Sequence, residues 1–123
     1  MKTKAVKISQ LVGDDLDFAI AIAIGMKYSG CWLTDSRGDN FLLTADFDGF
    51  SRLWSPSTLW GQGGPLIDQH ITKLLIPTKR DHYAIASIND IQHAGPSALI
   101  AAMRAVVAFY ALDEVVPVLD RSS

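Results

Sequence analysis

The sequence predicts a single α+β domain in which two main helices pack on an antiparallel sheet of about four to six strands. The chain of 123 residues fits one domain, residues 1–123, and leaves little room for a second. Its hydrophobic fraction of 49% and charged fraction of 20% are typical of a globular protein. Several short strand-like patterns surround two helix-like ones, of which the one near the C-terminus is the clearest.

The N-terminal third predicts a short strand followed by a helix. Residues 5–8 alternate between apolar and polar side chains, as a strand does. Residues 18–24 also alternate, but a helix would place four apolar side chains on one face: Leu16, Ile20, Ala23 and Ile24. Three aspartates at positions 14, 15 and 17 would stabilise a helix N-terminus, and Gly25 suits a left-handed helix end. We therefore expect a helix over residues 14–24.

The middle of the chain predicts two hairpins on either side of an irregular segment. Residues 31–33 and 41–47 flank a polar turn, and residues 71–76 and 82–88 flank another at residues 79–81. Between the hairpins lies the tryptophan segment, residues 51–65, with two tryptophans, three glycines and two prolines. Because flexible linkers lack tryptophan, we expect an ordered loop with aromatic anchors, and we expect Pro65 to open a short helix.

The C-terminal third predicts a long helix and an edge strand. Gly95 and Pro96 would start the helix, with the proline at its first position. Residues 97–112 are rich in alanine and carry an apolar stripe at helical spacing: Leu99, Met103, Val106, Val107 and Tyr110. Residues 115–119 resemble a strand, and Pro117 assigns it to an edge because proline cannot donate to a ladder.

Charge and cysteine content exclude several classes of protein. The formal net charge of −2 is too balanced for a general nucleic-acid binder. The single cysteine, Cys31, permits no intrachain disulfide, which suits a reducing cytoplasm, and its expected role is a packed side chain. The longest apolar run, residues 18–24, is too short to span a bilayer, and no signal-peptide pattern precedes it. We expect a cytoplasmic protein without a membrane partner.

Two glycine–proline segments are the strongest local signals for a site. Glycine lets a ligand approach the backbone, and a helix N-terminus offers free N–H groups and a partial positive charge, so a phosphate or carboxylate could bind there. The alternative is that each segment only turns the chain into a helix. The sequence contains no Walker lysine and no Gly-x-Gly-x-x-Gly after a strand. The two segments are Gln62-Gly63-Gly64-Pro65 and His93-Ala94-Gly95-Pro96-Ser97.

Three further side chains could complete such a site. Trp54 and Trp60 could stack on a nucleobase, or they could anchor their loop to the core. Arg104 lies two helical turns after Ser97 and could point back towards the helix start or form an exposed ion pair. The candidate ligand-binding residues are therefore Trp54, Trp60, Gln62, Gly63, Gly64, His93, Gly95, Ser97 and Arg104.

The sequence offers no catalytic or metal-binding constellation. No two histidines among residues 70, 82 and 93 have zinc-like spacing on one element, and Cys31 is remote from them. No nucleophile elbow or HExxH motif occurs, and the aspartates at 14, 15 and 17 fit helix-terminal charges better than catalytic acids. We expect a protein without a metal or cofactor that is not an enzyme.

Three segments together resemble one phage family. Residues 8–21 are similar to its opening strand and helix, and residues 55–68 contain its Trp-x-x-Gly-Gly-Pro-Leu-Ile signature. Residues 95–104, followed by residues 113–117, resemble its C-terminal signature. This is the NinX-like family of small proteins from tailed phages and prophages. The chain departs from the pattern at Phe18 and Ser97, where tryptophan and threonine are usual, and at residues 82–84, which replace Trp-x-Ala. The resemblance implies a phage or prophage protein acting in the bacterial cytoplasm, and it assigns no activity.

Two functional hypotheses follow. The first is a non-catalytic binder of a small anionic, nucleotide-like ligand, which by analogy with other small phage proteins would sequester a host defence signal. The second is a protein–protein adaptor or inhibitor of a host or phage enzyme, with the tryptophan segment as its interface. The ligand hypothesis requires the tryptophan segment to fold against the start of the last helix. The exposed edge of the predicted sheet also favours a homodimer.

Overall fold

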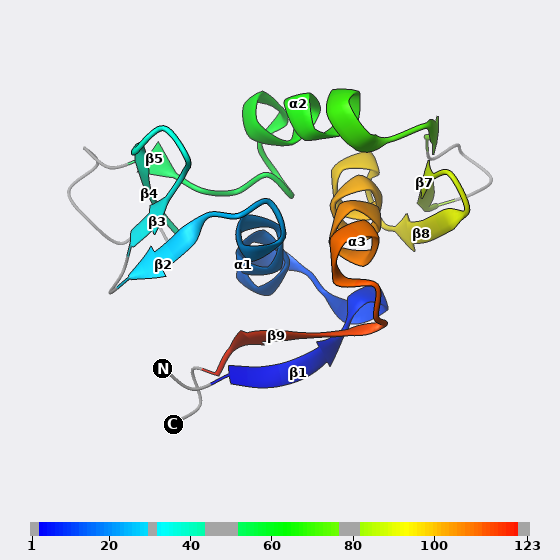
Figure 1. Ribbon diagram of the computed structural model, residues 1–123. Helices are drawn as coiled ribbons and strands as arrows, with labels where there is room; N and C mark the ends of the chain where they lie inside the picture. Colours follow the sequence, from blue (N-terminus) through cyan, green and yellow to red (C-terminus); the bar gives the residue numbers. More distant parts are fainter. Residues whose placement is uncertain (1–2, 30–31, 44–51, 77–81, 121–123) are drawn as a thin grey trace.

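The structure is a computed structural model that describes residues 3–29, 32–43, 52–76 and 82–120 (Figure 1). These residues form three α-helices, one 3-10 turn and nine short strands. The helices are α1 (Gly13–Ala23), α2 (Trp60–His70) and α3 (Ala98–Ala111), and the 3-10 turn is η1 (Ile8–Gln10). The strands are β1 (Thr3–Lys7), β2 (Lys27–Ser29), β3 (Trp32–Thr34), β4 (Asn40–Leu42), β5 (Arg52–Leu53), β6 (Lys73–Leu75), β7 (Ala84–Ile88), β8 (Ile91–Gly95) and β9 (Val115–Leu119).

The strands form three small sheets around the helices. β1 pairs with β9, strands β2-β3-β4-β5 form a second sheet, and β6-β7-β8 form a third. All pairs are antiparallel except β4–β5, which is parallel. The predicted α+β class is confirmed, but the predicted single sheet with two helices on it is wrong. The reason is that α1 and α3 pack on each other at the centre, so the strands are distributed around this pair (Figure 1).

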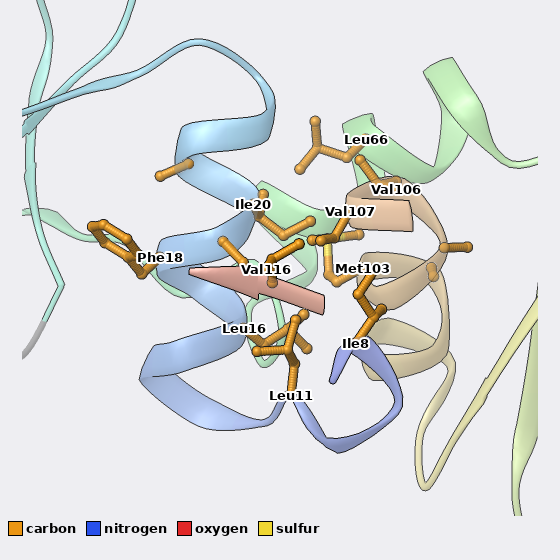
Figure 2. Close-up of a cluster of buried hydrophobic side chains, with 14 of the residues drawn as sticks. Ile8, Leu11, Leu16, Phe18, Ile20, Leu66, Met103, Val106, Val107 and Val116 are labelled. Carbon is orange, nitrogen blue, oxygen red and sulfur yellow. The ribbon is translucent and has the colours of Figure 1, made fainter. Parts of the chain in front are cut away.

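The core lies between α1 and α3. Figure 2 shows Leu16 and Ile20 of α1, Met103 and Val107 of α3, and Val116 of β9 meeting in one cluster. Leu66 of α2 and side chains of the η1 region complete it. Phe18 points to the opposite side of α1, where its ring meets the edge of the Tyr28 ring at a centroid distance of 5.4 Å. Helix α1 therefore packs on two sides, against the core with Leu16 and Ile20 and against Tyr28 with Phe18.

The predicted elements at both ends of the chain are present. The helix over residues 14–24 is confirmed as α1, and Gly25 follows it with a φ of 90°. The C-terminal helix is confirmed as α3, but Pro96 is not its first residue, because Ser97 is the N-cap. The edge strand is confirmed as β9, whose Pro117 lies opposite Ala5 in the ladder with β1.

The two predicted hairpins are confirmed in their described parts. β3 and β4 pair across the turn over residues 35–39, and β6 pairs with β7. Residues 44–47, residues 79–81 and Cys31 lie outside the described residues. Strand β8 was not predicted, because its residues 93–95 were interpreted as the approach to a helix. It pairs with β7 across a tight turn in which Asn89 has a φ of 54°.

The tryptophan segment differs most from its prediction. Its second half is not a loop, because α2 starts at Trp60 and Pro65 lies inside this helix. Glycine and proline both disfavour a helix interior, so tertiary packing has overridden local propensity here. Gly63 shows how: a β-carbon at this position would lie 2.4 Å from the Pro56 carbonyl oxygen and 2.6 Å from Leu99 Cδ2. Only a glycine lets α2 approach the preceding loop and α3 so closely.

We predict that Gly63→Ala destabilises the protein by about 2 kcal/mol, because the added methyl group overpacks a rigid backbone contact. Gly61→Ala, in the same helix, is the matched control. Its β-carbon would meet no atom within 4 Å, and it does not precede proline, so alanine should be neutral or stabilise the helix by up to about 1 kcal/mol. Urea unfolding followed by circular dichroism measures both changes. Equal effects of the two substitutions would contradict the packing argument.

Candidate functional site

A buried carboxylate attaches the tryptophan segment to helix α1. The side chain of Asp17 is 1% exposed. Its Oδ1 accepts a hydrogen bond from the Ser57 backbone N–H at 2.9 Å, and its Oδ2 accepts one from the Ser55 hydroxyl at 3.3 Å. The Asp17 backbone carbonyl accepts a third from Trp54 Nε1 at 2.9 Å. One residue of α1 thus holds three residues of the loop before α2.

The environment of Asp17 disfavours its charge. Burial raises the pKa of the Asp17 carboxyl from 3.8 to about 6, the hydrogen bonds from Ser57 and Ser55 oppose this rise, and the nearby Asp14 charge adds to it. No ion pair compensates Asp17 within the described residues, and the buried Ser57 hydroxyl beside it has no hydrogen-bond partner there. At neutral pH the loop is therefore held by a carboxylate whose charged form is destabilised by burial.

Gln62 and the first turn of α2 fix the other side of the loop. The Gln62 side chain accepts a hydrogen bond from the Ser55 N–H and donates one to the Leu53 carbonyl, both at 2.6 Å. The Ser55 carbonyl accepts a bond from the Leu59 N–H at 2.8 Å. The prediction of an ordered, anchored segment is thus confirmed for its described part.

The two tryptophans of this segment have opposite environments. Trp54 is 7% exposed and packs edge-on against the Phe41 ring at a centroid distance of 5.4 Å. It anchors the loop to the core, which was the alternative to stacking on a ligand. Trp60 is 58% exposed at the first position of α2, next to the exposed Leu59. Of these two tryptophans, only Trp60 presents its indole to solvent.

Arg104 is a structural residue in this arrangement. Its side chain is 8% exposed and points back towards the start of α3, as one of the two sequence interpretations predicted. Its Nε donates to the Leu11 carbonyl and its Nη1 to the Ala94 carbonyl, each at 2.9 Å. Burial lowers the pKa of the Arg104 guanidinium below its usual range. Among the described residues, two main-chain oxygens rather than an exposed ion pair therefore satisfy this charge.

The other predicted residues at the start of α3 also have intramolecular roles. The Ser97 hydroxyl accepts a hydrogen bond from the Ile100 N–H at 3.1 Å and so caps the helix. Gly95 permits a close backbone approach, because a β-carbon there would lie 2.7 Å from the Ala101 nitrogen. His93 is half-buried on β8, where burial and the neighbouring Arg104 charge lower its pKa and Glu114 raises it.

The structure brings the predicted residues together as two groups. Gly63 packs on Leu99, so the tryptophan segment does contact the first turn of α3. His93 and Arg104 form a second group beside β8. Within the described residues, no hydrogen bond or ring contact joins Trp60 to this second group.

Sequence reasoning missed both Asp17 and a concave surface around Tyr110. An apolar hollow of about 410 Å³ lies between α1, α3 and β9, and a more polar one of about 340 Å³ lies between the β3–β4 turn and the ends of α2 and α3. Tyr110 lines both hollows. Its hydroxyl is 2.8 Å from His70 Nε2, and His70 Nδ1 is 2.9 Å from the Leu66 carbonyl. The sequence pattern placed Tyr110 in the apolar stripe of α3. It therefore gave no sign that this residue lies on an exposed concave surface.

The fold and site define a small α+β protein that holds an exposed tryptophan on a firmly anchored segment. The described residues contain no cluster of ligands suited to a metal ion, and none of their helices is long and apolar enough to cross a membrane. The family model described as "Bacteriophage P22, NinX" matches residues 7–109. The chain therefore belongs to this NinX family of bacteriophage proteins.

The match confirms the resemblance seen in the sequence. It includes α1, the tryptophan segment and most of α3, whereas the resembling residues 113–117 lie beyond its end. None of the curated proteins compared with the chain matches it.

We predict that Asp17→Asn removes a pH dependence of stability. The folded-state pKa of about 6 exceeds the ordinary 3.8, so the free energy of unfolding falls as pH rises through this window and stays lower above it. The difference amounts to roughly 3 kcal/mol. Asparagine keeps an acceptor for the Ser57 N–H without the buried charge. The free energy of unfolding of the variant should therefore rise relative to that of the wild type between pH 4 and pH 7.

Urea unfolding at several pH values measures this gain. Asp68→Asn is the control, because it makes the same change of charge at an exposed position of α2. A stability difference between wild type and Asp17→Asn that stays constant with pH would show that burial does not perturb Asp17.

Proposed function

We propose that this phage-family protein is a non-catalytic adaptor or inhibitor that binds a host or phage protein through Trp60. The supporting observation is the contrast between the exposure of this indole and the rigidity of its support. Trp60 is 58% exposed, yet the loop before it is fixed by Asp17, Trp54 and Gln62. A rigid, exposed tryptophan is a common binding hot spot, since it loses little conformational entropy on association.

The neighbouring surface fits the same role. Leu59 is exposed directly before Trp60, so the start of α2 exposes two large apolar side chains. Exposed apolar area supported by a fixed backbone is a feature of interaction sites. The anchoring of the loop to the core is supplied by Trp54, so most of the Trp60 surface stays available to a partner.

The geometry supports a protein partner over a nucleotide-like ligand. The ligand hypothesis assigned stacking to Trp54 and Trp60, and charge to Arg104. Its backbone and hydroxyl donors were those of Gly63, Gly64, Gly95 and Ser97. Trp54 is buried, the Ser97 hydroxyl caps its own helix, and two carbonyls accept from Arg104. Of the residues proposed to hold the ligand, Trp60 offers the largest exposed side chain, and a single stacking surface provides little selectivity for a small anion.

We predict that Trp60→Ala abolishes capture of a specific partner from phage-infected host cells without loss of fold. Trp32→Ala is the matched control, because it removes an exposed indole from β3. Purified partner should then bind Trp60→Ala about 30-fold or more weakly than it binds the wild type or Trp32→Ala. Unchanged melting temperatures and circular dichroism spectra would exclude misfolding as the cause.

Two results would contradict the proposal. One is a partner that binds Trp60→Ala and the wild type equally. The other is a rise in melting temperature with nucleotides or cyclic nucleotides that Trp60→Ala abolishes, which would restore the ligand hypothesis.

A further inference from the structure

Leu112, which follows α3, is unfavourable both in its backbone and in its side chain. It has a φ of 56° and a ψ of 23°, the left-handed conformation in which glycine usually ends a helix. A leucine in this region is strained by its β-carbon. Its side chain is also 85% exposed, more than any other large hydrophobic residue in the described chain. The backbone conformation ends α3, where the Leu112 N–H bonds to the Ala108 carbonyl, but the folding of a single copy does not explain why an exposed leucine rather than glycine occupies it.

An apolar hollow opens directly beside Leu112. The hollow has a volume of about 410 Å³, and both neighbours of Leu112 in the chain, Ala111 and Asp113, line it. Its floor includes the buried Val107 and Val116, and its rim includes exposed side chains of Ile22, Tyr110 and Val115. A protruding leucine and an apolar recess thus adjoin on one surface.

We propose that this surface is the interface of a symmetric homodimer, in which Leu112 of each copy fills the hollow of the other. A two-fold interface uses the same patch on both subunits, so the patch must carry both the protruding group and its recess. A second copy accounts for both features at once, because each copy supplies the protruding leucine and the recess. This inference does not involve Trp60 and is independent of the adaptor role.

The surface also carries charges of both signs. Exposed Glu114 lies close to Leu112 in the chain, and exposed Lys7 lies opposite Val115 at the rim of the hollow. A two-fold interface can therefore pair the acid of one copy with the base of the other around its apolar centre.

Leu112→Gly separates this role from a structural one. Glycine relieves the left-handed backbone, so the isolated monomer should keep or raise its melting temperature. The same change removes the side chain that fills the hollow, so the dimer dissociation constant should rise about 100-fold or more. Sedimentation equilibrium over concentrations of about 10 µM to 1 mM measures association, and thermal unfolding at low concentration measures stability.

A second variant, Ala111→Trp, fills the hollow from an exposed helix position and leaves Leu112 in place. It should also be monomeric. A mixture of Leu112→Gly and Ala111→Trp should associate more strongly than either variant alone, because one intact leucine then meets one intact hollow. A wild-type protein that stays monomeric throughout this range would overturn the proposal. So would dimerisation unaffected by both substitutions, or a mixture that associates no better than its components.

Discussion

The arrangement of the whole molecule depends on the need to cover helix α3. Most residues of this helix are buried, and they lie around nearly its whole circumference. A helix that is apolar on all sides must be enclosed, and one sheet can cover only one side of it. Helices α1 and α2, strands β6 to β8 and the 3-10 turn each pack on α3, whereas β9 packs on α1 beside β1 (Figure 1). Three small sheets are the consequence.

Two buried charged residues fix the positions of the segments that pack around α1 and α3. Arg104 lies within the apolar surface of α3 and donates to the Leu11 and Ala94 carbonyls, so the guanidinium links the entry of α1 and the end of β8 to the central helix. Asp17 on α1 does the same for the loop before α2 through the Ser57 N–H and the Ser55 hydroxyl. A buried charge satisfied by main-chain groups fixes position more strictly than apolar contact does, because other arrangements leave it unpaired.

The sequence predicts local elements well where periodicity and terminal residues agree. Helices α1 and α3 and the edge strand β9 follow from their apolar patterns, with Gly25 and Pro117 as markers. The first turns of helix α2, residues 60–64, were predicted as loop, and the helix was expected to begin only at Pro65. The three glycines and Pro65 oppose a helix locally, and the contact of Gly63 with Leu99 that favours it is non-local. The number of sheets was wrong for a related reason. A stripe of apolar residues predicts one buried face, whereas the alanines of α3 bury the remaining faces without a periodic signal.

Site prediction failed at residues whose type allows more than one role. Arginine, serine and tryptophan near glycines suit ligand binding, but the same donors can satisfy the protein's own backbone, and only coordinates reveal which occurs. The distinction has a physical consequence for function. Groups that the fold already uses cannot also drive recognition, whereas Trp60 and Leu112 are exposed large apolar side chains with no evident role in the packing of a single copy. They lie at opposite ends of different helices, the start of α2 and the end of α3. Association at one site therefore leaves the other free, so a dimer formed through Leu112 would display two copies of Trp60 and would bind a repetitive or dimeric partner with gained avidity.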